Sequence, residues 1–466
     1  MMIKTEHISL KEKIGYGLGD AASSMFWKLF GMYLMFFYTD IFGLEAKVVG
    51  TMFLVTRVWD SLFDPIIGIL ADRTQSKWGK FRPYLLYVAV PFGVIGIFTF
   101  YTPSLTDSGK LVYAYLTYSV MMMVYSAINV PYASLLGVMS TAPKTRSVLA
   151  TFRMSFAYLG SFVTLLLFNP LVNFFSGHNL AIEAQQKGWV MAVAVIATCC
   201  VILFLLCFAW TRERVQPATD THTSLRQDIK DLLNNGPWWI LLGAGVSTLV
   251  FNSIRDGATL YYFKYYIHEE NYGGIRLFNI PFVLSGLYLA LGQAANIIGV
   301  ILAAPLSNSI GKKNTFVLTM LAATLGSVTF YWLDKSQLWG IFGLQVLISI
   351  CAGAVFPLLW SMYADCVDYS ELKTGNRATG LVFSSSSMSQ KLGWAFGTAV
   401  TGWLLGYFGF QANQLQSDET ISGIKMFLSI FPAAGTLLSV LFISFYPLTE
   451  KKMETITEEL DSRRKS

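Results

Sequence analysis

Charged side chains are scarce in this chain, at 13% of its 466 residues. Soluble globular proteins carry roughly 25%. Hydrophobic residues make up 54% of the chain and aromatic residues 15%. A soluble fold could not bury this much apolar surface, because single cores stop growing beyond roughly 250–300 residues. The composition therefore argues against a soluble enzyme, a nucleic-acid-binding protein and a disordered chain.

Cysteine and histidine are also rare. The five cysteines show no CxxC spacing, so neither a zinc site nor a disulfide framework is indicated. The four histidines fall in tails, loops or a span end, which argues against a histidine proton relay inside a membrane. No phosphate-binding loop or zinc-protease pattern is present. We therefore expect neither enzyme activity nor a cofactor.

Long apolar runs are what the chain does contain. A bilayer-spanning helix needs roughly 20 apolar residues. Runs of this kind lie at about 14–40, 48–71, 83–102, 111–139, 148–174, 188–210, 237–266, 279–305, 314–333, 337–365, 379–408 and 423–447. The pattern predicts an all-α membrane protein with twelve transmembrane helices in two six-helix halves, 1–210 and 237–447. A cytoplasmic linker at 211–236 separates the halves, and a tail follows at 448–466. Such halves are typical of transporters with a binding site between them.

Lysine and arginine predict the orientation of these helices. The N-terminus, the C-terminal tail, the central linker and every second loop hold 22 of the 34 basic residues, whereas the opposite loops hold 6. Cytoplasmic loops carry the excess of positive charge. Both termini are therefore expected in the cytoplasm, and most of the net charge of +6 reflects topology.

An ionisable residue inside a span costs roughly 2.5–3.5 kcal/mol on insertion scales, so each is a candidate for function. The candidates are Asp20, Lys28, Arg57, Asp60, Asp64, Arg153, Arg255, Asp256, Lys264, Asp365 and Lys391. Asp60 and Asp64 stand four residues apart, which places both carboxylates on one helix face. Such a pair can bind a hard cation or exchange a proton. Alternatively, Arg57 and the two acids form a salt-bridge network that holds helices together.

A second group of residues suggests a sugar site. Asp20 and Lys28 are about two helical turns apart on one face, and Trp27 is beside Lys28. An aromatic ring can stack on a sugar while polar groups fix its hydroxyls. Arg153 and Lys391 are lone cations in apolar spans, one in each half. They are expected to pair with the carboxylates at 60 and 64 or to donate hydrogen bonds to substrate.

Several longer motifs carry a family resemblance. They are IGYGLGD at 14–20, RVWDSLFDP at 57–65, WGKFRP at 78–83, YSAINVPY at 125–132 and ADCVDYSE at 364–371. In this order and placement they resemble the glycoside–pentoside–hexuronide:cation symporter family, the melibiose permease-like branch of the major facilitator superfamily. The resemblance implies a major facilitator fold and sugar uptake coupled to H⁺, Na⁺ or Li⁺. It also implies a protein of the bacterial inner membrane that works in the lipid bilayer, as a monomer and without nucleic acid.

The resemblance implies roles for particular residues. Asp60 and Asp64 match the family's two cation-site acids, and Ser126 matches a hydroxyl of that site. Arg153 matches a sugar-contacting arginine, and Lys391 matches a lysine between the sugar and cation sites. The remaining matches lie at the cytoplasmic gate. Salt bridges between the halves are expected there, formed by Asp365, Asp368, Glu371 and Arg377.

The sequence also departs from the melibiose permease. Phe63 replaces an amide at the cation site, which favours H⁺ over Na⁺ as the coupling ion. Ser23 and Ser24 replace a Lys-Asp pair, and Asn129 replaces an aspartate. We therefore expect a different pocket, built with Asp20, Trp27, Lys28 and Asn129, and a neutral glycoside or pentoside as substrate. A hexuronide stays open, as do an uncoupled sugar facilitator and a sugar sensor with a transporter fold.

Overall fold

The computed structural model describes most of the chain. The described residues are 8–140, 143–177, 179, 181–214, 230, 232–272, 275–277, 280–375 and 379–465. They form two compact units. Unit 1 comprises Met1–Thr219, Glu269–Ala290 and Gln411–Gln414, and unit 2 comprises Asp220–His268, Leu291–Phe410 and Leu415–Ser466. Two short segments of the second half of the sequence thus pack into unit 1.

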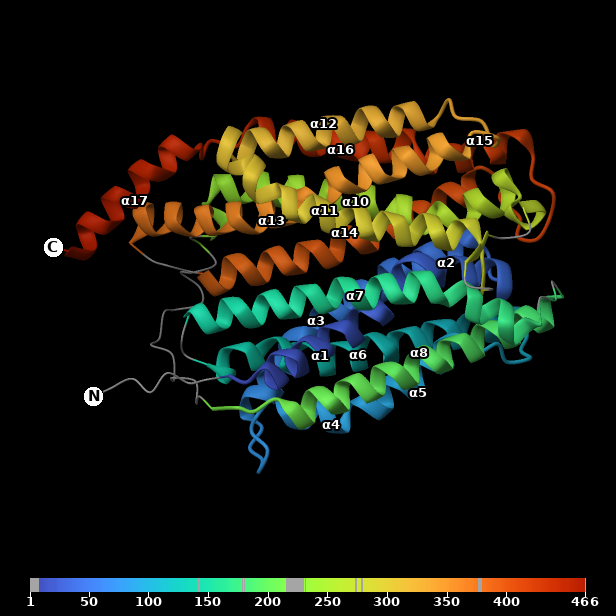
Figure 1. Cartoon of the computed structure of the whole chain (residues 1–466), viewed down its shortest axis with the longest axis horizontal. Helices are drawn as coiled ribbons and strands as arrows, with labels where there is room; N and C mark the ends of the chain where they lie inside the picture. The colour runs from blue at the N-terminus through green and yellow to red at the C-terminus, as the bar shows by residue number, and fades with distance from the viewer. Residues whose placement is uncertain are drawn as a thin grey trace. The chain divides into compact units, whose positions relative to one another are not determined.

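Helices dominate the first half of the sequence (Figure 1). In order they are α1 (Leu10–Lys28), η1 (Leu29–Tyr33), α2 (Leu34–Phe36), η2 (Phe37–Ile41), α3 (Ala46–Arg73), α4 (Arg82–Tyr87), α5 (Ala89–Thr99), α6 (Asp107–Met139), α7 (Pro143–Ser176) and α8 (Ile182–Trp210). The segments from α1 to η2 follow one another without a break, and only Val88 separates α4 from α5. This half therefore supplies six helical rods, as the apolar runs predict.

The second half follows the same plan. Its helices are α10 (Gly236–Tyr261), η3 (Tyr262–Ile267), η4 (Glu269–Tyr272), α11 (Leu284–Ile310), α12 (Lys312–Phe330), α13 (Leu338–Thr374), α14 (Thr379–Tyr407), α15 (Asp418–Leu428), α16 (Ile430–Ser444) and α17 (Glu450–Lys465). Among the described residues, seven helices of the chain are long and apolar enough to cross a membrane. The all-α prediction omits one small element, the antiparallel hairpin of β1 (Ile275–Leu277) and β2 (Ile280–Phe282).

Local sequence explains where the first rod begins and how it ends. Ser9 and Glu12 form a capping box, in which each side chain accepts a hydrogen bond from the other's backbone. The rod ends in π-helical turns, η1 and η2, and the first rod of the second half also ends in one, η3. The corresponding helices of the two halves therefore share an uncommon local geometry, one that often marks functional sites.

The rods pack through apolar and aromatic faces. In unit 1, α1 lies against α7 and α8, and α3 lies against α6. Beyond the end of α1, Tyr33 of η1, Phe37 of η2 and Phe168 of α7 surround the ring of Trp189 on α8. In unit 2, α10 packs on α14 and α16, and α12 packs on α13 and α16. These contacts place the inward face of α1 beside α6 and α7, where the candidate site lies.

One buried charge in unit 2 has a structural role. The last rod breaks between α15 and α16 at Ser429, whose φ of −128° and ψ of −85° are not helical. Arg255, which is 4% exposed, donates 2.7 Å hydrogen bonds to the Leu428 carbonyl at this break and to the Gln345 side chain. Arg255 therefore satisfies a carbonyl that the break leaves without its helical partner.

The described loop before α11 is also anchored by a carboxylate. Glu269 accepts hydrogen bonds from the Ser285 amide at 2.8 Å and the Ser285 hydroxyl at 2.9 Å. Burial raises the pKa of Glu269 to about 7, although the bonds from Ser285 lower it. Because the pKa of Glu269 is raised above its ordinary value, the folded protein binds this proton more tightly than the unfolded chain does. The contribution of protonated Glu269 to the stability of the fold is therefore lost as the pH rises through 7.

A bracket of hydrogen bonds ties the third and sixth rods of unit 1 together. Glu213, just after α8, accepts bonds from the backbone amides of Lys80, Phe81 and Arg82 at 2.8–2.9 Å. The Arg82 side chain returns a 2.7 Å bond to the Phe208 carbonyl near the end of α8. Gly79 is required here, because its φ is +106° and a Cβ would clash with the Glu213 carboxylate. We call this the first bracket.

Unit 2 contains the same device, which we call the second bracket. Glu450, just after α16, accepts a bond from the Lys312 amide at the start of α12. Lys313 donates 2.8 Å bonds to the Ser444 and Tyr446 carbonyls. Gly311 has a φ of +87°, and a Cβ there would clash with Glu450. The two halves are therefore related in detail, beyond their matching order of helices.

Replacing Glu213 by Gln should destabilise the protein. Gln keeps one acceptor oxygen and sets its NH₂ against at least one of the three amide donors, and a hydrogen bond to a charged group contributes about 1.5–3 kcal/mol. We expect a clear fall in the apparent melting temperature in detergent, larger than the fall caused by Glu450→Gln. Glu183→Gln, an exposed change in the first turn of α8, is the control. Equal melting temperatures for Glu213→Gln and the control would contradict this role.

Candidate functional site

Two of the predicted cation residues, Asp60 and Ser126, meet between α3 and α6. Ser126 donates a 2.8 Å hydrogen bond to Oδ1 of Asp60, and both side chains are about 1% exposed. Arg57 lies one turn earlier on α3, with Nη1 3.8 Å from Oδ2 of Asp60. Asp64 is half-buried one turn later on the same helix. One acid, a hydroxyl and an arginine are thus placed together inside unit 1, and the second acid follows one turn later on α3.

Arg57 connects this position to α1. Its guanidinium carbon lies 4.6 Å from the centre of the Trp27 ring and 6.0 Å from that of Tyr118. A cation over an aromatic face gains roughly 0.5–2 kcal/mol, more when water is excluded. Trp27 in turn lies 5.7 Å from the ring of Tyr125 on α6. The candidate sugar-stacking residue therefore touches the arginine that pairs with Asp60.

A neutral pair follows along the same helices. Ser23 donates a 2.5 Å hydrogen bond to Oδ1 of Asn129, and Nδ2 of Asn129 donates to the Tyr125 carbonyl at 3.0 Å. Both side chains stand at positions where the melibiose permease carries charged residues. Ser23 belongs to the replaced Lys-Asp pair, and Asn129 replaces an aspartate. Their mutual bond shows that the replacements act together. The pair fixes the Asn129 amide without any net charge.

The remaining substrate candidates of unit 1 form an ion pair between α1 and α7. Nε of Arg153 lies 3.0 Å from Oδ2 of Asp20. The guanidinium also lies 5.3 Å from the ring of Tyr132 on α6, whose hydroxyl donates to the Tyr16 carbonyl at 2.6 Å. Arg153 was expected to pair with the carboxylates at 60 and 64 or to contact substrate. The structure pairs it with Asp20 instead, because α7 packs directly on α1.

These contacts form a series of polar and aromatic groups along α1 and α6, with Arg57 and Asp60 from α3 and Arg153 from α7, which we call the polar path of unit 1. The sequence predicts only part of this path. Ser23 was noticed as a departure from the family pattern but not as a site residue, and Tyr125 and Tyr132 were not singled out. The signal for the two tyrosines was present, because positions 125, 129 and 132 share one face of a helix.

Other predicted residues lie elsewhere. Lys28 is half-buried at the end of α1. Lys391 is half-buried on α14 and Glu371 is half-buried on α13, both in unit 2. Arg377 lies outside the described residues. The roles of these residues remain predictions.

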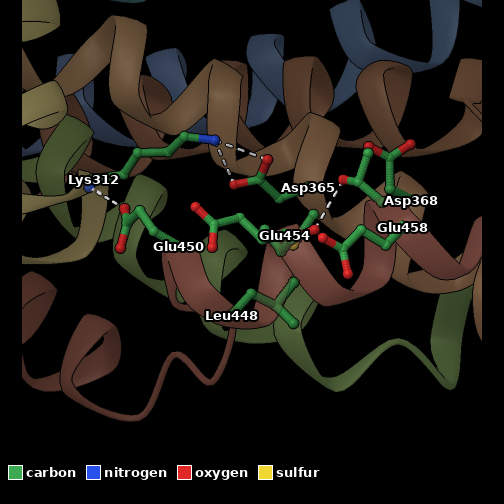
Figure 2. Close-up of a pocket in the computed structure, with 9 residues that line it drawn as sticks. Lys312, Asp365, Asp368, Leu448, Glu450, Glu454 and Glu458 are labelled. Atoms are coloured by element: carbon green, nitrogen blue, oxygen red, sulfur yellow. Dashed lines mark hydrogen bonds and ion pairs between the residues drawn. The ribbon is translucent and has the colours of Figure 1, made fainter.

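Two of the predicted gate acids line a pocket in unit 2 (Figure 2). The Lys312 ammonium binds both oxygens of Asp365, at 2.8 and 2.7 Å. Asp368 lies on the same helix and shares the pocket with Glu450 and Glu454 near the start of α17. Asp365 was expected to bridge the halves, and its described partner belongs to its own unit. Among the described residues, no group of three or more His, Cys, Asp or Glu side chains is placed to hold a metal ion.

Comparison with known proteins identifies the family. A family model described as MFS/sugar transport protein matches residues 15–450. The chain belongs to this family. It is 36% identical to the inner membrane symporter YicJ of Escherichia coli K12, over 98% of this chain and 96% of that protein. It is 34% identical to the isoprimeverose transporter of Lactiplantibacillus pentosus, over 96% and 90%. It is 32% identical to a glucuronide carrier protein homolog of Escherichia coli K12, over 99% and 97%.

Solved structures agree on the fold. The nucleoside transporter NupG has a TM-score of 0.64 at 16% identity, covering 94% of this chain and 99% of its own. The inward open xylose transporter XylE from E. coli has a TM-score of 0.62 at 14% identity, covering 96% and 98%. At these identities the likeness concerns the fold alone. The predicted major facilitator fold and family are confirmed, and the chain is a membrane transporter, not an enzyme.

The ion pair of Asp20 and Arg153 can be tested directly. Removing one partner of a largely buried pair leaves an uncompensated charge. Because the side chains are 12% and 28% exposed, we expect Arg153→Gln to cost about 2–4 kcal/mol of stability. The double change Asp20→Asn with Arg153→Gln should cost less than the sum of the single changes, because it leaves no lone charge.

Apparent melting temperatures of the four proteins complete this double-mutant cycle. Additive shifts would show that the two side chains act independently.

Proposed function

We propose that the protein imports a sugar by symport with a cation, through alternating access of a site near the middle of the membrane. The observation that carries this proposal is the polar path of unit 1. It brings Asp60 of α3 together with the aromatic and hydrogen-bonding side chains of α1 and α6, and it includes the ion pair of α1 with α7. Several curated relatives are named as symporters or sugar carriers, which supports the same reading.

Coupling follows from the cost of burying Asp60 and Asp64. Without a cation, Asp60 depends on Ser126 and on Arg57 for compensation. A proton or Na⁺ at the acids supplies part of that compensation. It thereby weakens the electrostatic attraction between Asp60 and Arg57. Arg57 then remains on Trp27, which fixes the ring for stacking on a sugar. Cation binding therefore favours sugar binding, and the effect is reciprocal.

We favour H⁺ as the coupling ion. The Phe63 side chain offers no oxygen or nitrogen at the position where the melibiose permease carries an amide, so an alkali cation has fewer ligands here. Na⁺ remains the second candidate. Both need the two carboxylates, so the residues of the site are the same in either case.

We favour a neutral glycoside or pentoside as substrate. In unit 1 the Asp20–Arg153 pair is internally balanced and the Ser23–Asn129 pair is neutral, which suits hydroxyl groups. Lys28 keeps a hexuronide as the second candidate, and the names of relatives include both an isoprimeverose transporter and a glucuronide carrier. In this proposal both termini lie in the cytoplasm of a bacterial cell and a single chain suffices for transport.

The ion and sugar can be identified in proteoliposomes. Purified protein is reconstituted, and uptake of a panel of radiolabelled glycosides, pentosides and hexuronides is measured under an imposed H⁺ or Na⁺ gradient. We expect concentrative uptake of a neutral sugar that is driven by the H⁺ gradient and abolished by an uncoupler. Uptake that only equilibrates under every gradient would favour an uncoupled facilitator. Binding without any movement of sugar would favour a sensor.

The two acids should be needed for coupling but not for every step. We expect Asp60→Asn and Asp64→Asn to abolish accumulation against a gradient, because a neutral amide cannot exchange the proton. Sugar binding or exchange should persist in part. Asp107→Asn, an exposed change at the start of α6, is the matched control. If either variant accumulates sugar like the parent protein, the coupling assignment is wrong.

A further inference from the structure

A small pocket lies at one end of unit 2, outside the polar path already described. Its volume is about 280 Å³. It is lined by Tyr265, Tyr266, His268, Asp334, Lys335 and Ile421. These residues come from η3, from the loop between α12 and α13, and from α15. The size is close to the lower end of the roughly 300–1,000 Å³ typical of small-molecule sites.

The backbone around this pocket is unusual. Tyr265 and Tyr266 belong to the π-helical η3, a geometry often found at functional sites. His268, which ends this turn, has a φ of +56° in the left-handed region. A non-glycine residue in this conformation costs roughly 1–3 kcal/mol. The hydroxyl of Tyr266 donates to the Leu333 carbonyl at 3.3 Å, which ties the turn to the loop.

Cationic side chains gather around the pocket. Lys335 lines it, the Lys425 ammonium lies 5.0 Å from the ring of Tyr266 and 5.3 Å from that of Tyr331, and the Lys264 ammonium lies 5.0 Å from the ring of Tyr265. Among the described residues, Asp334 is the one carboxylate in its lining. Asp418 and Glu419 stand in the first turn of α15, where they compensate the helix N-terminus. Lys335 and Asp334 balance each other in the lining, and Lys425 and Lys264 beside the tyrosine rings add the positive charge that suits an anion whose hydroxyl groups donate hydrogen bonds to Asp334.

Two exposed tryptophans give the position of the pocket along the membrane. Trp332 is 69% exposed and Trp339 is 94% exposed, and they flank the loop that carries Asp334 and Lys335. Tryptophan is enriched where a transmembrane protein meets the lipid headgroups. The same loop joins α12 to α13 at the end of their apolar stretches. Trp332 and Trp339 are therefore placed as expected for this boundary, beside the loop that lines the pocket.

We propose that this pocket binds the headgroup of an anionic phospholipid, with the phosphate held by Lys335 and the neighbouring lysines. The hydroxyl groups of a headgroup of the phosphatidylglycerol type face Asp334. The tyrosine rings and Ile421 cover the glycerol backbone. This site is independent of the sugar and the coupling ion, so it stands or falls separately from the proposed transport function.

The test uses the full-length protein in detergent with added lipid. Phosphatidylglycerol and phosphatidylcholine of equal chain length are offered in equal amounts, and retained lipid is counted by native mass spectrometry. We expect the parent protein to retain phosphatidylglycerol in preference. The double change Lys335→Gln with Lys425→Gln should weaken this retention by about 25-fold, because a lysine near a phosphate contributes about a fivefold factor.

The control removes two charges at a distance from the pocket. Lys47→Gln with Lys187→Gln changes two exposed lysines of unit 1 and should keep the preference of the parent. Lys335 lies in an exposed loop, so Lys335→Gln alone should keep the fold. This variant should lose about fivefold in the retention of phosphatidylglycerol, and Lys335→Arg should restore that retention.

Three results would overturn the proposal. The first is equal retention of the two lipids by the parent protein. The second is an equal loss of retention in the pocket variant and the control. The third is displacement of phosphatidylglycerol by millimolar inorganic phosphate, which would assign the site to a soluble anion.

Discussion

A charged side chain can lie among apolar helices only where a partner offsets the loss of its hydration. That constraint shapes both units of this transporter. Asp20 has Arg153, Asp60 has Ser126 and Arg57, and Arg255 has the carbonyl of a broken helix. Apart from the contact of Arg57 with Asp60 within α3, each partnership joins different helices. The charges that we propose to serve transport therefore also fix how the helices face one another.

In unit 1 the partnerships run from one helix to the next. Arg57 is shared between Asp60 and the Trp27 ring, so a change in charge at the acids is felt at the ring. Tyr125 contacts Trp27 by its ring and Asn129 through its carbonyl. In the proposed function, a shift of the Arg57 guanidinium couples the cation site to the sugar site without a large motion.

The sequence predicts the helices and the positions of the charged residues along them well, because both depend on local pattern. Twelve apolar runs correspond to the helical rods, and the i, i+4 spacing places Asp60 and Asp64 on one face of α3. It does not predict the pairs, because these depend on how helices distant in sequence are rotated. Arg153 meets Asp20 only because α7 lies on α1. The break at Ser429, the π-helical turns and the hairpin carry no strong signal in composition or periodicity.

The two brackets explain why the repeat between the halves is hard to see in the sequence. Each glutamate binds backbone amides, which every residue other than proline supplies. The side chains of that loop are therefore free to diverge, provided that one glycine and one acid stay in place. Two halves that arose by duplication can lose nearly all sequence identity while the bracket keeps its geometry. Structural alignment of the halves should then reveal common ancestry after sequence alignment has failed.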